Sequence, residues 1–393
     1  MNNDYPRIPL GSIIEFHRGY DLPEYKRESG CFPVFSSAGI TGHHNKYKVD
    51  GENVITGRYG TIGKVYYYDG KCWPHNTALY VSDFKRNVPL YIFFLLQHAL
   101  NVDGNDKSTV PGVNRNDLYY LKVPFQDDKN IQLQLTRILS LLDRKIALNN
   151  AINAELEKTA KLLYDYWFVQ FDFPGANGKP YRSSGGAMEY NEQLKRKIPK
   201  GWRVKTLSGV VDNITEGTKP GEHLRGLFYT PLDIIPMRRM SFYGGQSYED
   251  ANSSLMLYRK NDILLGAMRV HFHRVCISAQ DGITRSTTIV MRPKIPDIMP
   301  FLYQVLNSNE TIEFAVRQSG KSQQPYVNWE SELEKYSFAM PPETLVRQYS
   351  RKVRPVIAEV ILHEHENHEL VSLRDFLLPL LMNGQVMVTT NTY

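Results

Sequence analysis

Two long stretches of the chain place apolar residues at steps of three and four, the spacing of helices that pack along one seam. They cover about residues 129–169 and 343–382. The predicted seam of the first consists of Ile131, Leu135, Ile138, Leu142, Lys145, Asn149, Ile152, Leu156, Thr159 and Leu163. The predicted seam of the second consists of Val346, Tyr349, Val353, Val356, Val360, His363, Asn367, Leu370, Arg374, Leu377 and Leu381. Both stretches are therefore predicted to be long helices.

The two seams superpose at a constant sequence offset of 218, which places Asn149 and Asn367 at equivalent positions. An asparagine in a helix seam costs stability but fixes the register of the helix pair. We therefore predict that the two helices pack on each other as an intramolecular coiled coil, with Asn149 and Asn367 setting its register. Two ordinary amphipathic helices on separate cores are the alternative, which the shared register disfavours.

The sequence before each predicted helix repeats itself, which is the strongest evidence for the architecture. Four segments recur in the same order, at offsets that drift from 197 to 217 as loop insertions would produce. Pro9-Leu10-Gly11 resembles Thr206-Leu207-Ser208, Asn53-Val54-Ile55-Thr56-Gly57 matches Asp262-Ile263-Leu264-Leu265-Gly266, Val110-Pro111-Gly112-Val113-Asn114 matches Gln324-Pro325-Tyr326-Val327-Asn328, and Leu121-Lys122-Val123-Pro124 matches Phe338-Ala339-Met340-Pro341. Each half therefore combines strand-like segments with a long helix.

The predicted fold class is α+β: two globular domains of mixed α/β structure, joined by two long antiparallel helices in a pseudo-two-fold repeat. The Gly-, Ser- and Pro-rich segment after the first helix is typical of a linker. The predicted divisions are a first globular domain at 1–128, a helix at 129–170, a linker at 171–198, a second globular domain at 199–341, a helix at 342–384 and a tail at 385–393.

Composition places the chain among ordinary globular proteins. Of its 393 residues, 42% are hydrophobic and 22% are charged, which is enough to build proper cores. Three cysteines without C-x-x-C spacing argue against a disulfide framework and fit a reducing cytoplasm. The N-terminus has no signal-peptide pattern, and no apolar stretch is long enough to predict a membrane span. The net charge of +6 lies mainly in residues 190–340, which permits nucleic-acid binding without proving it.

Motifs for catalysis are not evident in the sequence. The Pro341-Pro342 pair lacks the flanks of an amino-methyltransferase loop, and Ser319-Gly320-Lys321-Ser322 lacks the first glycine of a phosphate-binding loop. The run from His363 to His368 lacks the spacing of a helical zinc motif, so we interpret it as a helix face with His363 in the seam. We therefore predict no catalytic residues, no metal ligands and no cofactor bound by this chain.

Polar and aromatic loops suited to binding remain. Residues 57–64 and their counterpart 266–274 combine backbone-permissive glycines with cations, and Arg can pair with guanine edges. A second pair of loops, 105–110 and 318–324, offers amide side chains that can pair with adenine. Ordinary polar surface is the alternative for any one of them. The candidate DNA-binding residues are Arg58, Tyr59, Lys64, Lys107, Thr109, Arg115, Arg269, His271, Arg274, Lys321, Gln323, Gln324 and Tyr326.

Several of these segments resemble those of the specificity subunits of type I restriction-modification systems. The resemblance rests on Pro9-Leu10-Gly11, Gly57-Arg58-Tyr59-Gly60, Val113-Asn114, Leu163-Tyr164-Asp165-Tyr166-Trp167-Phe168 before Phe171-Asp172-Phe173-Pro174, and Ile198-Pro199-Lys200-Gly201-Trp202. It implies two target-recognition domains that each read half of a split double-stranded DNA site, with the helices as a ruler. It also implies that methyltransferase subunits dock on the helices, that a restriction (translocase) subunit joins them, and that S-adenosylmethionine, ATP and magnesium act on those partners. Gly266-Ala267-Met268-Arg269 departs from the first loop's pattern.

Two other classes of function remain open from the residues alone. The chain could be a DNA nuclease or methyltransferase with an unrecognised site, which turnover of DNA by the purified chain would reveal. It could also be a two-domain coiled-coil scaffold that binds proteins.

Overall fold

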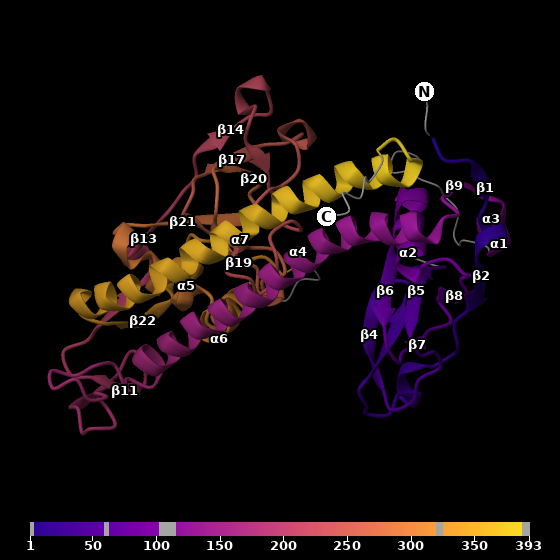
Figure 1. Cartoon of the computed structure of the whole chain (residues 1–393). Coiled ribbons are helices and arrows are strands. Elements are labelled where there is room, and N and C mark those ends of the chain that lie inside the picture. The colour runs from indigo at the N-terminus through magenta and orange to yellow at the C-terminus, as the bar shows by residue number, and fades with distance from the viewer. Residues whose placement is uncertain (1–3, 59–62, 102–114, 320–324, 387–393) are drawn as a thin grey trace, which may run out of the picture. The chain divides into compact units, whose positions relative to one another are not determined.

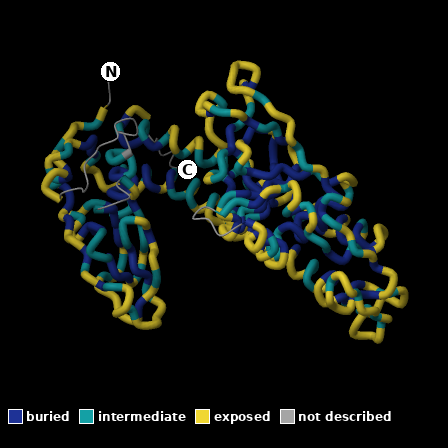
Figure 2. Tube along the Cα trace, turned by 180° about the vertical axis from the view of Figure 1, so that it is seen from behind, coloured by how far each residue is buried: buried dark blue, intermediate teal, exposed yellow. Residues whose placement is uncertain are grey.

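The computed structural model describes residues 4–58, 63–101, 115–319 and 325–386, which form two compact units (Figure 1). Unit 1 comprises Met1–Lys145 and Leu370–Tyr393, and unit 2 comprises Ile146–Glu369. The two long helices, α4 (Lys129–Tyr164) and α7 (Glu343–Asn383), each contribute residues to both units. Figure 2 shows buried segments running through the interior of each unit and exposed segments at its loops.

The described residues of unit 1 form sheets ordered β2-β8-β5-β6, β4-β3-β7 and β1-β9. Helix α2 packs its apolar face on β5 and β6, where Ile92 and Leu95 join Val54 and Leu135 in one core that excludes water. The elements are β1 Arg7–Pro9, α1 Leu10–Ile13, β2 Glu15–Arg18, η1 Glu24–Lys26, β3 Phe32–Ser36, β4 Gly39–His44, β5 Glu52–Gly57, β6 Val65–Asp69, β7 Trp73–Pro74, β8 Ala78–Asp83, α2 Pro89–Asn101, α3 Arg115–Tyr120 and β9 Lys122–Pro124.

Unit 2 is built around sheets ordered β13-β21-β18-β19-β16 and β14-β17-β20-β15, with pairs β12-β22 and β10-β11. Its elements are η2 Asp165–Val169, a π-helical end of α4, then β10 Met188–Asn191, β11 Arg196–Pro199, β12 Arg203–Thr206, η3 Leu207–Gly209, β13 Val211–Asn213, β14 Gly217–Thr218, η4 Glu222–Leu224, β15 Phe228–Tyr229, β16 Ser241–Phe242, η5 Tyr248–Asp250, β17 Leu255–Tyr258, β18 Ile263–Gly266, η6 Val270–Phe272, β19 Val275–Ser278, β20 Gly282–Thr284, β21 Thr288–Pro293, η7 Pro296–Ile298, α5 Met299–Leu306, α6 Asn309–Gln318, η8 Leu333–Lys335 and β22 Ser337–Met340.

The predicted repeat is confirmed in the sheet topology. The order β2-β8-β5-β6 in unit 1 reappears as β13-β21-β18-β19 in unit 2, and β1-β9 reappears as β12-β22. The matched strands β5 and β18 end at Gly57 and Gly266, as the sequence predicted. The next residue makes the same bond in both: the Arg58 amide donates to the Thr77 carbonyl and the Ala267 amide to the Thr287 carbonyl, each at 2.9 Å.

The two long helices are confirmed, and they pack antiparallel. Within unit 2, the Asn149 side chain meets Asn367 and that of Asn153 meets His363, so the numbers rise along α4 as they fall along α7. Within unit 1, Arg374 of α7 pairs with Asp143 of α4 at 3.0 Å.

The predicted seam of α4 was wrong at alternate positions. Lys145, Ile152 and Thr159 are exposed, whereas Ile146, Asn153 and Ala160 occupy the seam. The correct steps, from Leu135 through Leu139, Leu142, Ile146, Asn149, Asn153, Leu156 and Ala160 to Leu163, are still four and three. Apolarity favoured Ile152 over Asn153, but Asn153 is buried because its amide is hydrogen-bonded across the helix pair.

The segment predicted as a linker, residues 171–198, is more ordered than its composition indicated. It contains β10 and most of β11, which pair as a hairpin. Phe171 and Phe173 are buried, and their rings lie 5.3 and 5.5 Å from that of Trp202. These aromatic contacts attach the segment to the core of unit 2. Among the helices of the described residues, none has the length and apolar character needed to cross a membrane.

Candidate nucleic-acid interface

The loop that follows β18 presents charged and aromatic side chains at the surface of unit 2. Arg269 is exposed and adopts φ 50°, in the left-handed region that turns the chain sharply. Its guanidinium carbon lies 6.0 Å from the centroid of the Phe272 ring, and the neighbouring His271 is also exposed. Cations next to exposed rings suit a nucleic acid, because phosphates attract the charge and bases stack on the rings.

The structure brings this loop together with the segment before β22. The Arg269 amide donates to the Pro325 carbonyl at 2.8 Å, and Met268 forms an isolated bridge with Tyr326. The Val327 amide donates to the Ala267 carbonyl at 3.0 Å. Of the sequence-predicted residues in the two loops of this unit, Arg269 and Tyr326 therefore share one surface.

Tyr326 connects this surface to a third loop that the sequence analysis missed. Its hydroxyl donates to the Ser286 carbonyl at 2.6 Å, and burial raises the pKa of this phenol. Ser286 lies in the turn between β20 and β21, where Arg285 is exposed. The corresponding turn of unit 1 contains His75 and Thr77, whose side chains are 3.1 Å apart. The sequence repeat could have identified this third loop, because in both units the turn packs against the strand that ends at the matched glycine.

Arg274 has a different environment from Arg269. Its guanidinium donates to the backbone carbonyls of Ile235 and Asp233, the latter at 3.2 Å. The neighbouring His273 is buried, with its Nε2 2.7 Å from Oδ1 of Asn307, and desolvation by this burial lowers its pKa. Both side chains hold the base of the loop in place.

In unit 1, Arg58 is half-buried at the end of β5, beside Thr77. Lys64 is exposed, and its carbonyl accepts the Thr56 hydroxyl at 3.0 Å. Arg115 stands on α3, where it donates to the Phe16 carbonyl at 3.4 Å and lies 5.9 Å from the Tyr119 ring centroid. The other candidates lie outside the described residues: Tyr59, Lys107, Thr109, Lys321, Gln323 and Gln324.

A second group of rings in unit 1 was not singled out from the sequence. The Lys48 ammonium lies 5.0 Å from the ring centroids of both Tyr20 and Trp73. The hydroxyls of Tyr20 and Tyr80 are 3.0 Å apart, and His17 stacks on Tyr20. These residues come from four separate segments, so no local sequence motif predicts the cluster.

A polar block interrupts the apolar seam between α4 and α7 within unit 2. The Asn149 amide donates to Oδ1 of Asn367 at 3.0 Å and to Glu366 at 2.7 Å. His363 Nδ1 and Asn153 Oδ1 are 2.7 Å apart. Arg239 pairs with Glu364 at 2.7 Å and Glu157 at 3.4 Å. Buried polar groups need these partners, and a shift of one helix by a turn would break every bond.

Within the described ranges, no three His, Cys, Asp or Glu side chains gather as metal ligands would. The histidine run follows its predicted pattern: His363 is buried in the seam, whereas His365 is exposed and lies 3.4 Å from Glu369.

Comparisons with known proteins agree on one kind of relative. A family model described as a type I restriction modification DNA specificity domain matches residues 2–158. The MjaIX type I restriction enzyme specificity subunit of Methanocaldococcus jannaschii is 23% identical over 320 residues, which cover 76% of this chain and 69% of the relative. The HindI specificity subunit of Haemophilus influenzae is 22% identical over 314 residues, covering 66% of this chain and 68% of the relative.

The fold also has a counterpart among solved structures. The type I restriction-modification S subunit from M. genitalium aligns with a TM-score of 0.59 at 15% identity, over 97% of this chain and 96% of that one. The predicted α+β class is therefore confirmed.

Proposed function

Because the chain belongs to the family of type I restriction-modification specificity subunits, we propose that it reads a bipartite sequence in double-stranded DNA and leaves catalysis to its partners. Each unit recognises one half of the site. The candidate residues of the first half are Arg58, Tyr59, Lys64, Lys107, Thr109 and Arg115. Those of the second are Arg269, His271, Lys321, Gln323, Gln324 and Tyr326, whereas Arg274 is bound to backbone carbonyls at the base of the loop.

One observation carries the proposal: the two units share a sheet framework but not the side chains of their loops. Arg58 and Ala267 follow equivalent glycines and make equivalent backbone bonds, yet one is a cation and the other a methyl group. A shared scaffold with different loop chemistry is what two readers of unrelated half-sites require, because hydrogen bonds to base edges supply the specificity.

The surfaces of the long helices support a docking role for them. Large apolar side chains are exposed along both helices, including Leu148 on α4, at 55%, and Phe376 on α7, at 65%. Others are Leu133, Leu141, Leu162, Leu362 and Leu373. Exposed apolar side chains in such number indicate a protein interface. We propose that methyltransferase subunits cover them, and that a restriction subunit joins the assembly.

The partner subunits then supply the chemistry. S-adenosylmethionine would be held by the methyltransferase subunits, and ATP with magnesium by the restriction subunit, in the cytoplasm where the DNA lies. The role of this chain is to position those subunits on a chosen sequence.

Exchange of one recognition unit tests the proposal. Residues 5–128 are replaced with the corresponding domain of another specificity subunit, and the genome methylated by the assembled complex is sequenced. The expected result is a methylated motif in which one half changes and the other is retained. Replacing residues 199–341 instead is the matched control, and it should change the opposite half. A change in both halves after a single exchange, or DNA turnover by the purified chain alone, would contradict the proposal.

A further inference from the structure

In the part of unit 1 that the structure describes, the main sheet ends in an open edge. In the order β2-β8-β5-β6, strand β6 pairs with β5 on one side, and no strand of the described residues pairs with its other side. The strand Val65-Tyr66-Tyr67-Tyr68-Asp69 carries no proline or lysine, and its one charged residue, Asp69, lies at its end. Such an edge is a template for another strand.

The equivalent edge in unit 2 is closed by the chain itself. Val54 pairs with Tyr67 in unit 1, and the matched Ile263 pairs with Ile277 in unit 2, so β6 corresponds to β19. Strand β16 runs parallel to β19, and the Ile277 amide donates to the Met240 carbonyl at 2.8 Å. By this equivalence, the Tyr67 amide of unit 1 faces the open edge.

An insertion explains why only unit 2 closes its own sheet. Phe35 lies on β3, which pairs in parallel with β7, and Tyr229 lies on β15, which pairs in parallel with β20. The two residues therefore occupy equivalent positions. Eighteen positions separate Phe35 from Asn53, whereas thirty-three separate Tyr229 from Asp262. Strand β16 lies in this longer connection. The connection in unit 1 is shorter and supplies no counterpart of β16 in the described residues.

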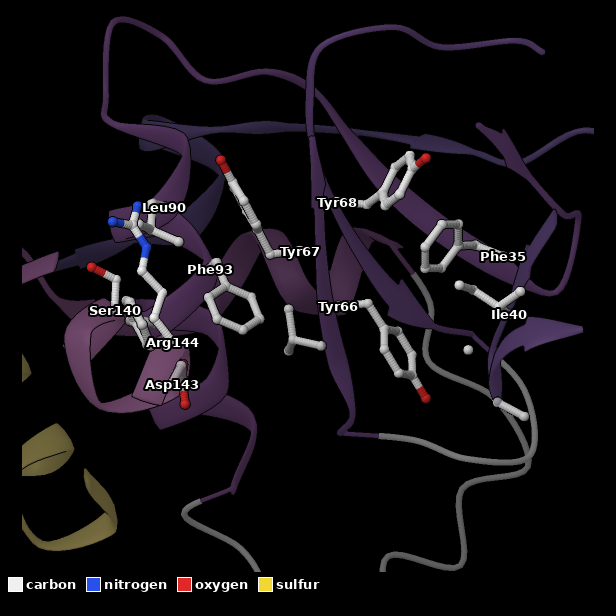
Figure 3. Close-up of a pocket in the computed structure, with 14 residues that line it drawn as sticks. Phe35, Ile40, Tyr66, Tyr67, Tyr68, Leu90, Phe93, Ser140, Asp143 and Arg144 are labelled. Carbon is white, nitrogen blue, oxygen red and sulfur yellow. The ribbon is translucent and has the colours of Figure 1, made fainter. Parts of the chain in front are cut away.

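The side chains next to the open edge form an apolar groove of about 680 Å³ (Figure 3). On one face of β6 the rings of Tyr67 and Phe93 lie 5.8 Å apart, and on the other those of Tyr66 and Phe35 lie 6.3 Å apart. Ile40, more than half exposed, lines the second side. Unit 2 fills the two corresponding faces with Met240 and Phe242 of its own chain, which belong to separate cores.

We propose that an extended segment of the protein subunit that docks on α4 and α7 adds to this sheet, pairing with β6 and placing one apolar side chain on each face of the edge. Added strands gain affinity from main-chain hydrogen bonds and specificity from side-chain pockets. The inference rests on the proposed function, because that function supplies the partner.

The groove's position favours the subunit that docks on the helices as the source of this segment. Ser140, Asp143 and Arg144 of α4 form one wall, so the groove is continuous with the helix surface proposed for docking. Asp143 is paired with Arg374, and Arg144 is exposed at the rim. Asp69 of β6 and Glu52, which accepts the Tyr67 hydroxyl at 2.6 Å, offset the charge of Arg144, so charge does not select the segment. An unpaired strand edge offers a row of backbone donors and acceptors, which another polypeptide strand can match and a phosphate backbone cannot, so we favour protein over DNA as the occupant.

Hydrogen exchange in the free chain and in the assembled complex with the methyltransferase subunit tests the proposal, with unit 2 as an internal control. The Tyr67 amide, followed in a fragment covering residues 65–69, should exchange at least tenfold more slowly in the complex. A fragment covering residues 275–278 should change little, because β16 already covers that edge. Protection along α4 and α7 without any change in residues 65–69 would overturn this inference and leave the proposed function intact. No protection on the helices would overturn both.

A pair of variants separates a specific strand from general proximity. Ile40→Asp places a charge in the groove and should weaken binding of the methyltransferase subunit by about tenfold. Tyr25→Asp changes a residue of the same unit that is 84% exposed and outside the groove, and should leave binding within about twofold. Thermal unfolding of both variants establishes that they fold. Equal affinities for the two variants, or protection of residues 65–69 in the free chain at high concentration, which a second copy would cause, would refute the assignment.

Discussion

At the scale of single residues, identical side chains five positions apart have different roles. Arg269 is exposed beside Phe272, whereas the guanidinium of Arg274 is bound by backbone carbonyls of Asp233 and Ile235. The sequence places both in one cationic loop and cannot separate them, because the carbonyls that bind Arg274 come from a segment about forty positions earlier. Only the fold brings that segment to the loop.

These two arginines provide a matched pair of substitutions. Arg269→Ala should weaken specific DNA binding by the assembled complex about tenfold, since one base contact contributes about 1–3 kcal/mol, while thermal stability stays close to that of the parent. Arg274→Ala should lower the unfolding temperature instead, because it leaves the part-buried Ile235 carbonyl and the Asp233 carbonyl without this donor. Binding titrations and thermal unfolding of both variants give the comparison, and equal DNA affinity for Arg269→Ala and the parent would reject its assignment.

Acidification should destabilise unit 2 through His273. Burial lowers the pKa of this imidazole from its ordinary value of 6.5, so the unfolded state binds more protons than the folded state just below that pH. Stability is therefore complete above about pH 6.5 and falls as the pH drops toward the folded pKa. Urea unfolding at pH 7.5 and 5.5 should show a smaller loss for His273→Gln than for the parent. The exposed His365→Gln serves as control, and an equal loss in all three proteins would contradict this prediction.

At the scale of elements, periodicity predicted both long helices nearly to their ends but misassigned part of one seam. Heptad steps of four and three fit α4 in two phases, which share Leu135, Leu142, Asn149, Leu156 and Leu163. Apolarity selected the phase containing Ile152, which is exposed. The correct phase contains Asn153, and what buries this asparagine is its contact with His363 and Glu364 of α7. Sequence periodicity within one helix contains no information about such partners.

The candidate nucleic-acid surface of unit 2 could be predicted only in part, because the sequence does not show which distant segments meet. Repetition singled out the segments around Gly266 and Pro325, and the structure places them in contact through Arg269 and Tyr326. The turn containing Arg285 was missed, because a hydrogen bond from Tyr326 to Ser286 is what connects this turn to the surface. Contacts between segments that are distant in sequence define a surface, whereas motifs define only its separate pieces.

At the scale of the whole molecule, the internal repeat made the fold predictable. The structural differences between the two copies could not be predicted. Four matched segments sufficed to predict two similar globular parts, and the shared strand orders confirm them. The change in sequence offset between the matched segments indicated insertions, but not the secondary structure that these insertions form. The insertion before Asp262 contributes β16 and closes one sheet. The same framework therefore has a covered edge in unit 2 and, among the residues that the structure describes, an open one in unit 1.

We predict that the two long helices set the distance between the half-sites. Seven residues are inserted into α4 after Lys145 and into α7 after Glu369, where each helix passes from one unit to the other. A heptad keeps the seam in phase and lengthens each helix by about 10 Å, or about three base pairs. The methylated motif should keep both half-sites with a spacer about three base pairs longer, at lower affinity because DNA twist must adjust. Four-residue insertions shift the seam and should abolish activity. An active heptad variant that keeps the original spacer would show that the helices do not set this distance.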